Sequence, residues 1–133
     1  MTFNNINPSS NGITGGTGSK ITVGHTGVYN IQFSAQFDKT DEGRDNCNIW
    51  LSVGGTEVTG TNRNTILASS DSNDLICSWN YIQSLNANEY VELSWHSIDT
   101  AMRISAIGAT AYNTVQIPST PSVIATINSI TNS

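Results

Sequence analysis

The segment Tyr29-Asn30-Ile31-Gln32-Phe33-Ser34-Ala35-Gln36-Phe37-Asp38 alternates apolar and polar side chains without interruption. Successive side chains of a β-strand point to opposite faces of its sheet, so this period predicts a strand with one face in a hydrophobic core and the other in water. The same alternation recurs in further segments, namely Cys47–Val53, Leu75–Tyr81, Val91–Trp95, Met102–Ala106 and Val123–Ile127. With shorter strands at Ile21–Val23 and between Glu57 and Leu67, the sequence predicts about eight strands.

Clusters of Gly, Ser, Asn and Asp separate these segments and are typical of tight turns. They lie at residues 24–27, 41–45, 69–74 and 97–100. No segment carries apolar residues at the i, i+3, i+4, i+7 spacing of an amphipathic helix. Many short strands between turns indicate an all-β protein, built as a sandwich or a barrel of antiparallel strands.

The chain of 133 residues has the length of one domain. Residues 1–19 are rich in Asn, Ser, Gly and Thr and predict an extended N-terminal arm. Residues 20–133 then form the single domain. Near its end, Ile117-Pro118-Ser119-Thr120-Pro121 is a stiff spacer, because each proline fixes φ and cannot donate to a sheet. We expect the strand that follows, residues 122–130, to pair with the edge of a sheet.

Charged residues make up only 11% of the chain, and the net charge is -5. A nucleic-acid partner would need a basic stripe that displaces counterions, so the acidic balance argues against one. No apolar run approaches the roughly 18 residues of a membrane span. We therefore expect neither a nucleic acid nor a membrane as partner.

Two further groups of residues leave their chemistry open. Cys47 and Cys77 lie inside predicted strands, where free buried thiols are favoured over a disulfide between neighbouring strands. The acidic turn of residues 38–45 contains Asp38, Asp41, Glu42 and Asp45 and offers oxygen ligands for Ca²⁺. Lys39 and Arg44 supply counter-charges in the same turn, which favours a solvated loop. We predict no metal and no cofactor.

Signals for catalysis are weak. His96 lies near Ser94, Ser97 and Asp99, but neighbours along one strand do not meet as a relay of nucleophile, base and orienting acid. A hydrolase of surface polymers would need a pair of carboxylates in a groove. The side chains to mutate in order to exclude that activity are Glu57, Glu89 and Glu92. We expect a protein that is not an enzyme.

Some apolar side chains fall out of phase with the predicted core. These are Trp50, Ile76, Ile82 and Tyr90. Single exposed apolar residues are common on monomers, and an exposed Trp50 offers a ring on which a sugar could stack. The alternative is a second buried surface supplied by identical neighbours, which low surface charge also favours. The predicted trimer-interface residues are therefore these four together with Tyr112.

Several segments resemble the C1q/tumour-necrosis-factor-like jelly rolls. Gly27–Phe37 is similar to the opening long strand of that family, and Asn48–Val58 to its next strand and hairpin. Asn88–Trp95 resembles a later strand, with Asn88-Glu89 where Gly-Asp is usual. Pro118–Ile124 resembles the tails of small tailed-phage virion proteins of this kind. The resemblance implies an antiparallel jelly-roll sandwich of about 8–10 strands that assembles as a homotrimer through one sheet.

From the resemblance and the out-of-phase residues we expect a virion structural protein, assembled in the host cytoplasm. The leading hypothesis is a trimeric capsid decoration (cement) protein that binds the major capsid protein or other virion proteins and stabilises the phage head. The alternative is the receptor- or glycan-binding tip of a phage tail fibre or appendage. A tip requires a concave surface of polar and aromatic side chains, whereas a decoration protein does not.

Overall fold

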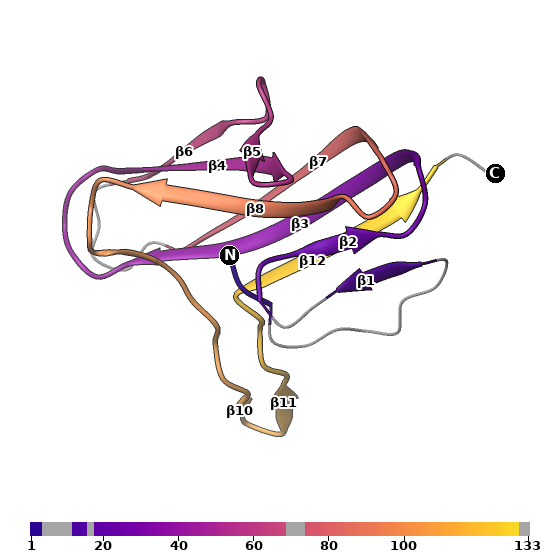
Figure 1. Ribbon diagram of the computed structural model, residues 1–133. Helices are drawn as coiled ribbons and strands as arrows, with labels where there is room; N and C mark the ends of the chain where they lie inside the picture. The colour runs from indigo at the N-terminus through magenta and orange to yellow at the C-terminus, as the bar shows by residue number, and fades with distance from the viewer. Residues whose placement is uncertain (4–11, 16–17, 69–73, 131–133) are drawn as a thin grey trace.

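The computed structural model describes residues 1–3, 12–15, 18–68 and 74–130, and this part of the chain contains strands and no helix (Figure 1). The strands are β1 (Ile13–Gly15), β2 (Ile21–Val23), β3 (Gly27–Lys39), β4 (Asp45–Val53), β5 (Thr56–Glu57), β6 (Arg63–Leu67), β7 (Leu75–Leu85), β8 (Tyr90–Ser97), β9 (Met102–Ile104), β10 (Thr110–Tyr112), β11 (Val115–Ile117) and β12 (Val123–Ser129). The prediction of an all-β protein is confirmed.

Two antiparallel sheets face each other as a β-sandwich. The first, here called sheet I, has the order β1-β2-β8-β4-β5, and β6 also pairs with β4. The second, sheet II, has the order β12-β3-β7, and β9 also pairs with β3. The chain crosses between the sheets from β3 to β4 and again from β7 to β8 (Figure 1). This arrangement agrees with the predicted antiparallel sandwich, while the jelly-roll strand order stays a prediction.

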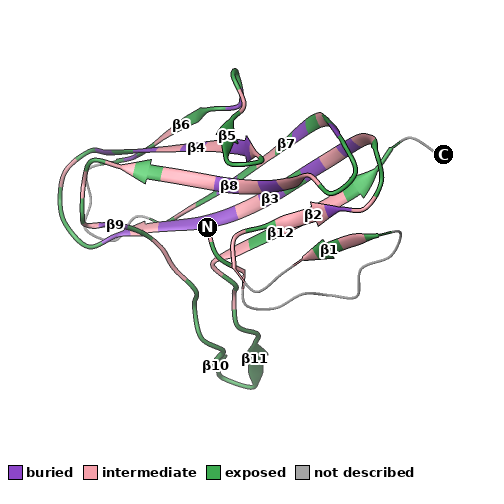
Figure 2. Ribbon diagram, in the orientation of Figure 1, coloured by how far each residue is buried: buried purple, intermediate pink, exposed green. Residues whose placement is uncertain are grey.

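The core lies between the two sheets and follows the predicted alternation. On β3 the buried apolar side chains are Tyr29, Ile31, Phe33, Ala35 and Phe37. On sheet I, Cys47, Ile49 and Leu51 of β4 are fully buried (Figure 2). The Phe37 ring of sheet II meets the Trp95 ring of sheet I edge-on, with centroids 6.0 Å apart, so aromatic contacts join the layers.

The alternation fails at several positions, among them Gln36, Ser52 and Ala106, and the cause is clear at the first and the last. Gln36, expected on the solvent face of β3, is buried because the backbone around Ser105 and Ser122 pairs with it: Ser105 N donates to Gln36 O, and Gln36 N donates to Ser122 O. Ala106, expected in the core after β9, is exposed because the chain leaves sheet II there. Both corrections depend on strand neighbours that are distant in sequence.

The described part of the predicted N-terminal arm, residues 1–19, adds to sheet I. Strand β1 pairs with β2, in the register Ile13↔Val23. The Met1 ammonium donates to Leu93 O at 2.6 Å, and burial lowers the pKa of this ammonium. Residues 4–11 and 16–17 of the arm lie outside the described residues.

The C-terminal strand confirms the predicted pairing with a sheet edge. Strand β12 runs antiparallel to β3 from Val123↔Ala35 to Ser129↔Tyr29. Before it, the chain forms a hairpin of β10 and β11 that projects from the sandwich (Figure 1). Every residue from 106 to 119 is exposed (Figure 2). Antiparallel hydrogen bonds between Ile107 and Thr120 close the base of the hairpin.

Candidate functional site

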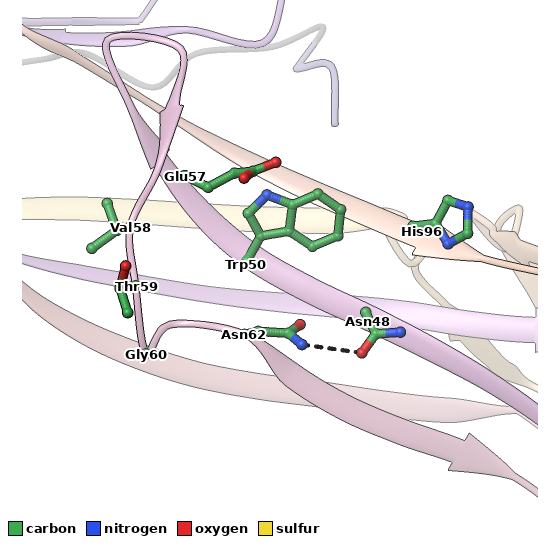
Figure 3. Close-up of a pocket in the computed structure, with 8 residues that line it drawn as sticks. All are labelled: Asn48, Trp50, Glu57, Val58, Thr59, Gly60, Asn62 and His96. Atoms are coloured by element: carbon green, nitrogen blue, oxygen red, sulfur yellow. Dashed lines mark hydrogen bonds between the residues drawn. The ribbon is translucent and has the colours of Figure 1, made fainter.

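The outer face of sheet I contains an open hollow of about 530 Å³ around Trp50 (Figure 3). Its lining residues are Asn48, Trp50, Glu57, Val58, Thr59, Gly60, Asn62 and His96. We call it the Trp50 hollow. It combines one large aromatic ring with carboxylate, amide and imidazole groups, which is the mixture that small-molecule sites use to orient a ligand.

Strand register places the floor of the hollow on one face. Asn48 and Trp50 are two residues apart on β4, so both side chains point to the same side of sheet I. His96 of β8 pairs with Asn48, and Glu57 of β5 pairs with Ser52 of β4. Paired residues of antiparallel strands share a face. Three strands therefore bring Asn48, Trp50, Glu57 and His96 to the same surface.

A tight turn brings β5 back along β4. Gly54 and Gly55 form the two-residue loop between β4 and β5, with φ of 58° and 82°. Two positive φ values are what a type I′ turn requires, and glycine adopts them without steric cost. A Cβ on Gly55 would also lie only 3.3 Å from the Tyr90 hydroxyl. The turn therefore fixes the position of Glu57 beside β4.

The wall of the hollow is the segment from Val58 to Asn62, which is anchored by a buried threonine. Leu51 N donates to Thr61 Oγ1 at 3.0 Å, and Thr61 Oγ1 donates to Val58 O at 2.7 Å. The Tyr81 hydroxyl of sheet II donates to Thr61 O at 2.7 Å. The wall is thus held by both sheets before any ligand arrives, which reduces the entropy cost of binding.

The amide side chains along one side of the hollow form a network. Asn48 Oδ1 accepts hydrogen bonds from Asn62 Nδ2 and Asn64 Nδ2, each at 3.2 Å. With its oxygen used in this way, Asn48 has N–H donors to offer, while Asn62 and Asn64 have carbonyl oxygens. Figure 3 shows the Asn48–Asn62 pair and Glu57 on either side of the indole ring. Donors and acceptors therefore surround the ring.

The predicted interface residues fall on three separate surfaces. Trp50 and Tyr90 lie on the outer face of sheet I, where the Lys20 ammonium lies 4.1 Å from the centre of the Tyr90 ring. Ile76 and Ile82 lie on the outer face of sheet II and are 66% and 60% exposed. Tyr112 lies on the projecting hairpin and is 72% exposed. The structure does not bring the five residues together as one patch.

Sequence reasoning missed the wall of the Trp50 hollow. Val58, Thr59, Gly60 and Asn62 belong to a loop whose position depends on the Thr61 anchor. The Gly54-Gly55 pair was a detectable signal of the preceding turn, but nothing local shows that the next residues fold over Trp50.

The acidic turn is arranged differently from the expectation. Among the described residues, the carboxylates that lie within 4.8 Å of one another belong to Asp41, Asp45 and Asp99. The Lys39 ammonium is buried and lies 3.3 Å from Asp45 Oδ2. It also donates a hydrogen bond to Gly43 O in the same turn. Asp38 faces away and accepts from Arg103, whose hydrogen bond lowers the pKa of the Asp38 carboxyl. Asp45, the buried carboxylate among Asp41, Asp45 and Asp99, is therefore already paired with the Lys39 ammonium.

The residues weighed for catalysis are engaged elsewhere. The Ser97 hydroxyl donates to Asn46 O at 2.8 Å and accepts from Asp99 N, so it holds a turn. Glu92 accepts a hydrogen bond from the Ser19 hydroxyl, and Glu89 accepts one from Asn86 N. Of the three candidate glutamates, Glu57 is the one that lines the Trp50 hollow.

Cys47 of β4 and Cys77 of β7 are both buried, and both thiols are free. Burial, with the neighbouring Cys77 as a second cause, raises the pKa of Cys47 to about 12. Burial also raises the pKa of Cys77, which the Thr65 hydroxyl partly opposes. Raised pKa values disfavour the thiolate, which is the reactive form.

We expect the native protein at about pH 8 to leave both thiols unmodified by a chromogenic disulfide reagent, because they are neutral and buried. The same assay in concentrated denaturant should titrate both cysteines of each chain. Rapid reaction of the folded protein would contradict the burial of these thiols. A reducing wash before the assay should leave the result unchanged.

No protein-family model matches this chain, and no curated protein matches it either. The described part of the chain has no helix long and apolar enough to cross a membrane. The class of this protein therefore follows from its own fold and surface features. It belongs to the class of antiparallel β-sandwiches, with an aromatic and polar hollow on one outer face and an exposed apolar hairpin.

Proposed function

We propose that this protein is a homotrimeric virion structural protein that decorates the phage capsid and stabilises it. The observation that carries the proposal is the projecting β10–β11 hairpin, which exposes large apolar side chains to solvent. The exposed apolar residues along it are Ile107, Tyr112, Val115 and Ile117. A surface of this kind is typical of a segment that is buried against another protein.

The hairpin has one apolar face. Tyr112 pairs with Val115, and Thr110 pairs with Ile117, so the alternation of strand side chains places Tyr112, Val115 and Ile117 together. Ala111 and Gln116 occupy the other face. A two-stranded hairpin is only marginally stable by itself in water. Burying each large apolar side chain contributes about 1.5–3 kcal/mol, which supports association through this face.

The outer face of sheet II supplies a surface that fits the hairpin. From Val28 to Gln36 on β3, and along β7 and β12, its outward residues carry no charge. Ile76, Ile82 and Ile124 are exposed there, and Ile124 lines a hollow of about 510 Å³. Interface cores are depleted of charged residues, so this face has the composition of a contact surface.

A cyclic trimer needs two different surfaces on each subunit, because each copy contacts the next through a head-to-tail interface. The hairpin of one copy and the outer face of sheet II of the next copy supply these two surfaces. This assignment keeps Ile76, Ile82 and Tyr112 as interface residues. It places Trp50 and Tyr90, on sheet I, outside the interface.

The placement in a virion rests on the resemblance of Pro118–Ile124 to the tails of small tailed-phage virion proteins, together with the resemblance of Gly27–Phe37 to the C1q/tumour-necrosis-factor-like jelly rolls. A trimer that contacts several capsid subunits binds as one multivalent unit with a high effective concentration. A protein that binds only the assembled shell stabilises that shell by mass action. Binding energy, and not catalysis, would be the mechanism.

The direct test has two parts. In sedimentation equilibrium, we expect the purified protein to have the mass of three chains. Empty phage shells saturated with it should melt at a higher temperature than bare shells. A folded monomer at high concentration would overturn the trimer, and an unchanged melting temperature would overturn the capsid role.

A second candidate function is favoured by one observation. The Trp50 hollow is the concave surface of polar and aromatic side chains that the tip of a fibre or appendage requires. The number of copies per particle separates the two roles. Hundreds of copies support capsid decoration, whereas a few dozen or fewer support a position on the tail.

A further inference from the structure

We propose that the Trp50 hollow binds a neutral carbohydrate, with one sugar ring stacked on the indole of Trp50 and its hydroxyls bonded by Glu57, Asn48 and Asn62. This proposal does not depend on the virion or on the trimer. It rests on the ring, the polar groups and the charge of the site.

The ring of Trp50 differs from those of the other two tryptophans in its contacts. Trp79 lies 5.5 Å from Phe33 and Trp95 lies 6.0 Å from Phe37, between ring centroids, so both pack against the core. All three tryptophans are partly buried, but Trp50, in the part of the chain that the structure describes, has no aromatic partner. A flat aromatic surface that is accessible to solvent can stack against the C–H face of a pyranose ring.

The polar groups around the ring match sugar hydroxyls, each of which both donates and accepts. The Glu57 carboxylate accepts at one side. On the other side, the amides of Asn48 and Asn62 are oriented by their mutual hydrogen bond at 3.2 Å. Because the Thr61 anchor fixes the wall, Asn62 keeps its position next to Asn48 without a ligand.

The charge of the site favours a neutral ligand over an acidic one. Glu57 adds a negative charge inside the hollow of a protein whose net charge is -5. Arg63, near the wall, already donates to Gly60 O at 3.1 Å and Asn62 O at 2.9 Å. Lys20 lies over the Tyr90 ring instead. Among the residues that line the hollow, Glu57 is the one with a formal charge at pH 7, so an anionic sugar would meet repulsion there.

The test uses four trisaccharides as probes: maltotriose, cellotriose, triacetylchitotriose and sialyllactose. Each is titrated to about 10 mM into ¹⁵N-labelled protein, since single shallow sugar sites bind weakly. The indole N–H signals of the three tryptophans report the position of binding. With at least one neutral probe, we expect the Trp50 signal to shift while those of Trp79 and Trp95 do not.

Variants assign the binding to the hollow. Trp50→Ala should weaken binding of that probe by about tenfold or more, whereas Trp50→Phe should retain part of it because a ring remains. Glu57→Gln should weaken binding while the fold, monitored by the other indole signals, is unchanged. Ile98→Ser removes an exposed apolar side chain outside the hollow and should have no effect.

Three results would overturn the proposal. They are the absence of binding by every neutral probe, binding that Trp50→Ala leaves unchanged, and tighter binding of sialyllactose than of all neutral probes. Since the hollow lies on sheet I and the proposed trimer contact on sheet II and the hairpin, sugar binding should be the same in trimeric and monomeric forms. Failure of one proposal therefore leaves the other standing.

Discussion

A chain that carries Tyr112→Ser and Val115→Ser is expected to sediment as a monomer, whereas the unmodified protein is expected to sediment as a trimer. Tyr112 and Val115 pair on the apolar face of the projecting hairpin and are 72% and 60% exposed. They make few contacts within their own chain, so their loss should leave the unfolding temperature nearly unchanged. Two apolar side chains at about 1.5–3 kcal/mol each correspond to association weaker by at least about a hundredfold.

The matched control is Gln116→Ser, which changes the polar face of the same hairpin and should remain trimeric. Ile82→Ser, on the opposing surface of sheet II, should weaken the trimer as the Tyr112 and Val115 changes do. Sedimentation equilibrium over a range of concentrations gives the oligomeric state of the double variant, of Gln116→Ser and of Ile82→Ser. A double variant that stays trimeric at low concentration would show that copies meet elsewhere.

The largest loss of stability is expected from Asp45→Ala. The side chain of Lys39 is fully buried, and its ammonium lies 3.3 Å from the Asp45 carboxylate. Removal of Asp45 leaves a buried charge without its partner, which costs about 3–5 kcal/mol. Domains of this size have free energies of unfolding of only about 5–15 kcal/mol. Urea denaturation should therefore show a large decrease in the midpoint.

Two further variants separate the burial of this ion pair from a general effect of charge. Lys39→Met combined with Asp45→Ala removes both charges and should recover much of the stability. Arg103→Gln breaks an ion pair with Asp38 in which the arginine side chain is 58% exposed to screening solvent, and should lower the stability far less than Asp45→Ala. A loss of unfolding free energy for Asp45→Ala as small as that for Arg103→Gln would contradict the burial of Lys39.

Long strands could be predicted because their signal is local. Apart from the buried Gln36, the alternation from Tyr29 to Phe37 matches the buried face of β3, and the alternations in β4, β7 and β8 identified the other long strands. Strands β1, β5, β10 and β11 were missed; two or three residues display a period poorly, although β2 and β9, which are equally short, were identified. The turn at Gly54-Gly55 was recognisable because positive φ favours glycine.

The candidate site was only partly predictable for the same reason. Trp50 was identified as an outward-facing ring from its phase on the strand, and the structure places it on the outer face of sheet I. Whether it would have neighbours depended on the loop that Thr61 holds over it, through bonds to Leu51 and Tyr81. The approach of Asp99 to Asp41 and Asp45 likewise joins two turns that were considered separately.

The amino-acid sequence alone determined that the chain is all-β, which side chains enter the core, and which apolar groups are left over. These properties follow from the two-residue period of an extended backbone, which acts over a few residues. The tertiary structure alone decided how the leftover groups are distributed: Trp50 and Tyr90 on sheet I, Ile76 and Ile82 on sheet II, and Tyr112 on the hairpin. The physical reason is that a strand's neighbours are chosen by hydrogen bonds between segments far apart in the chain, which no local pattern encodes.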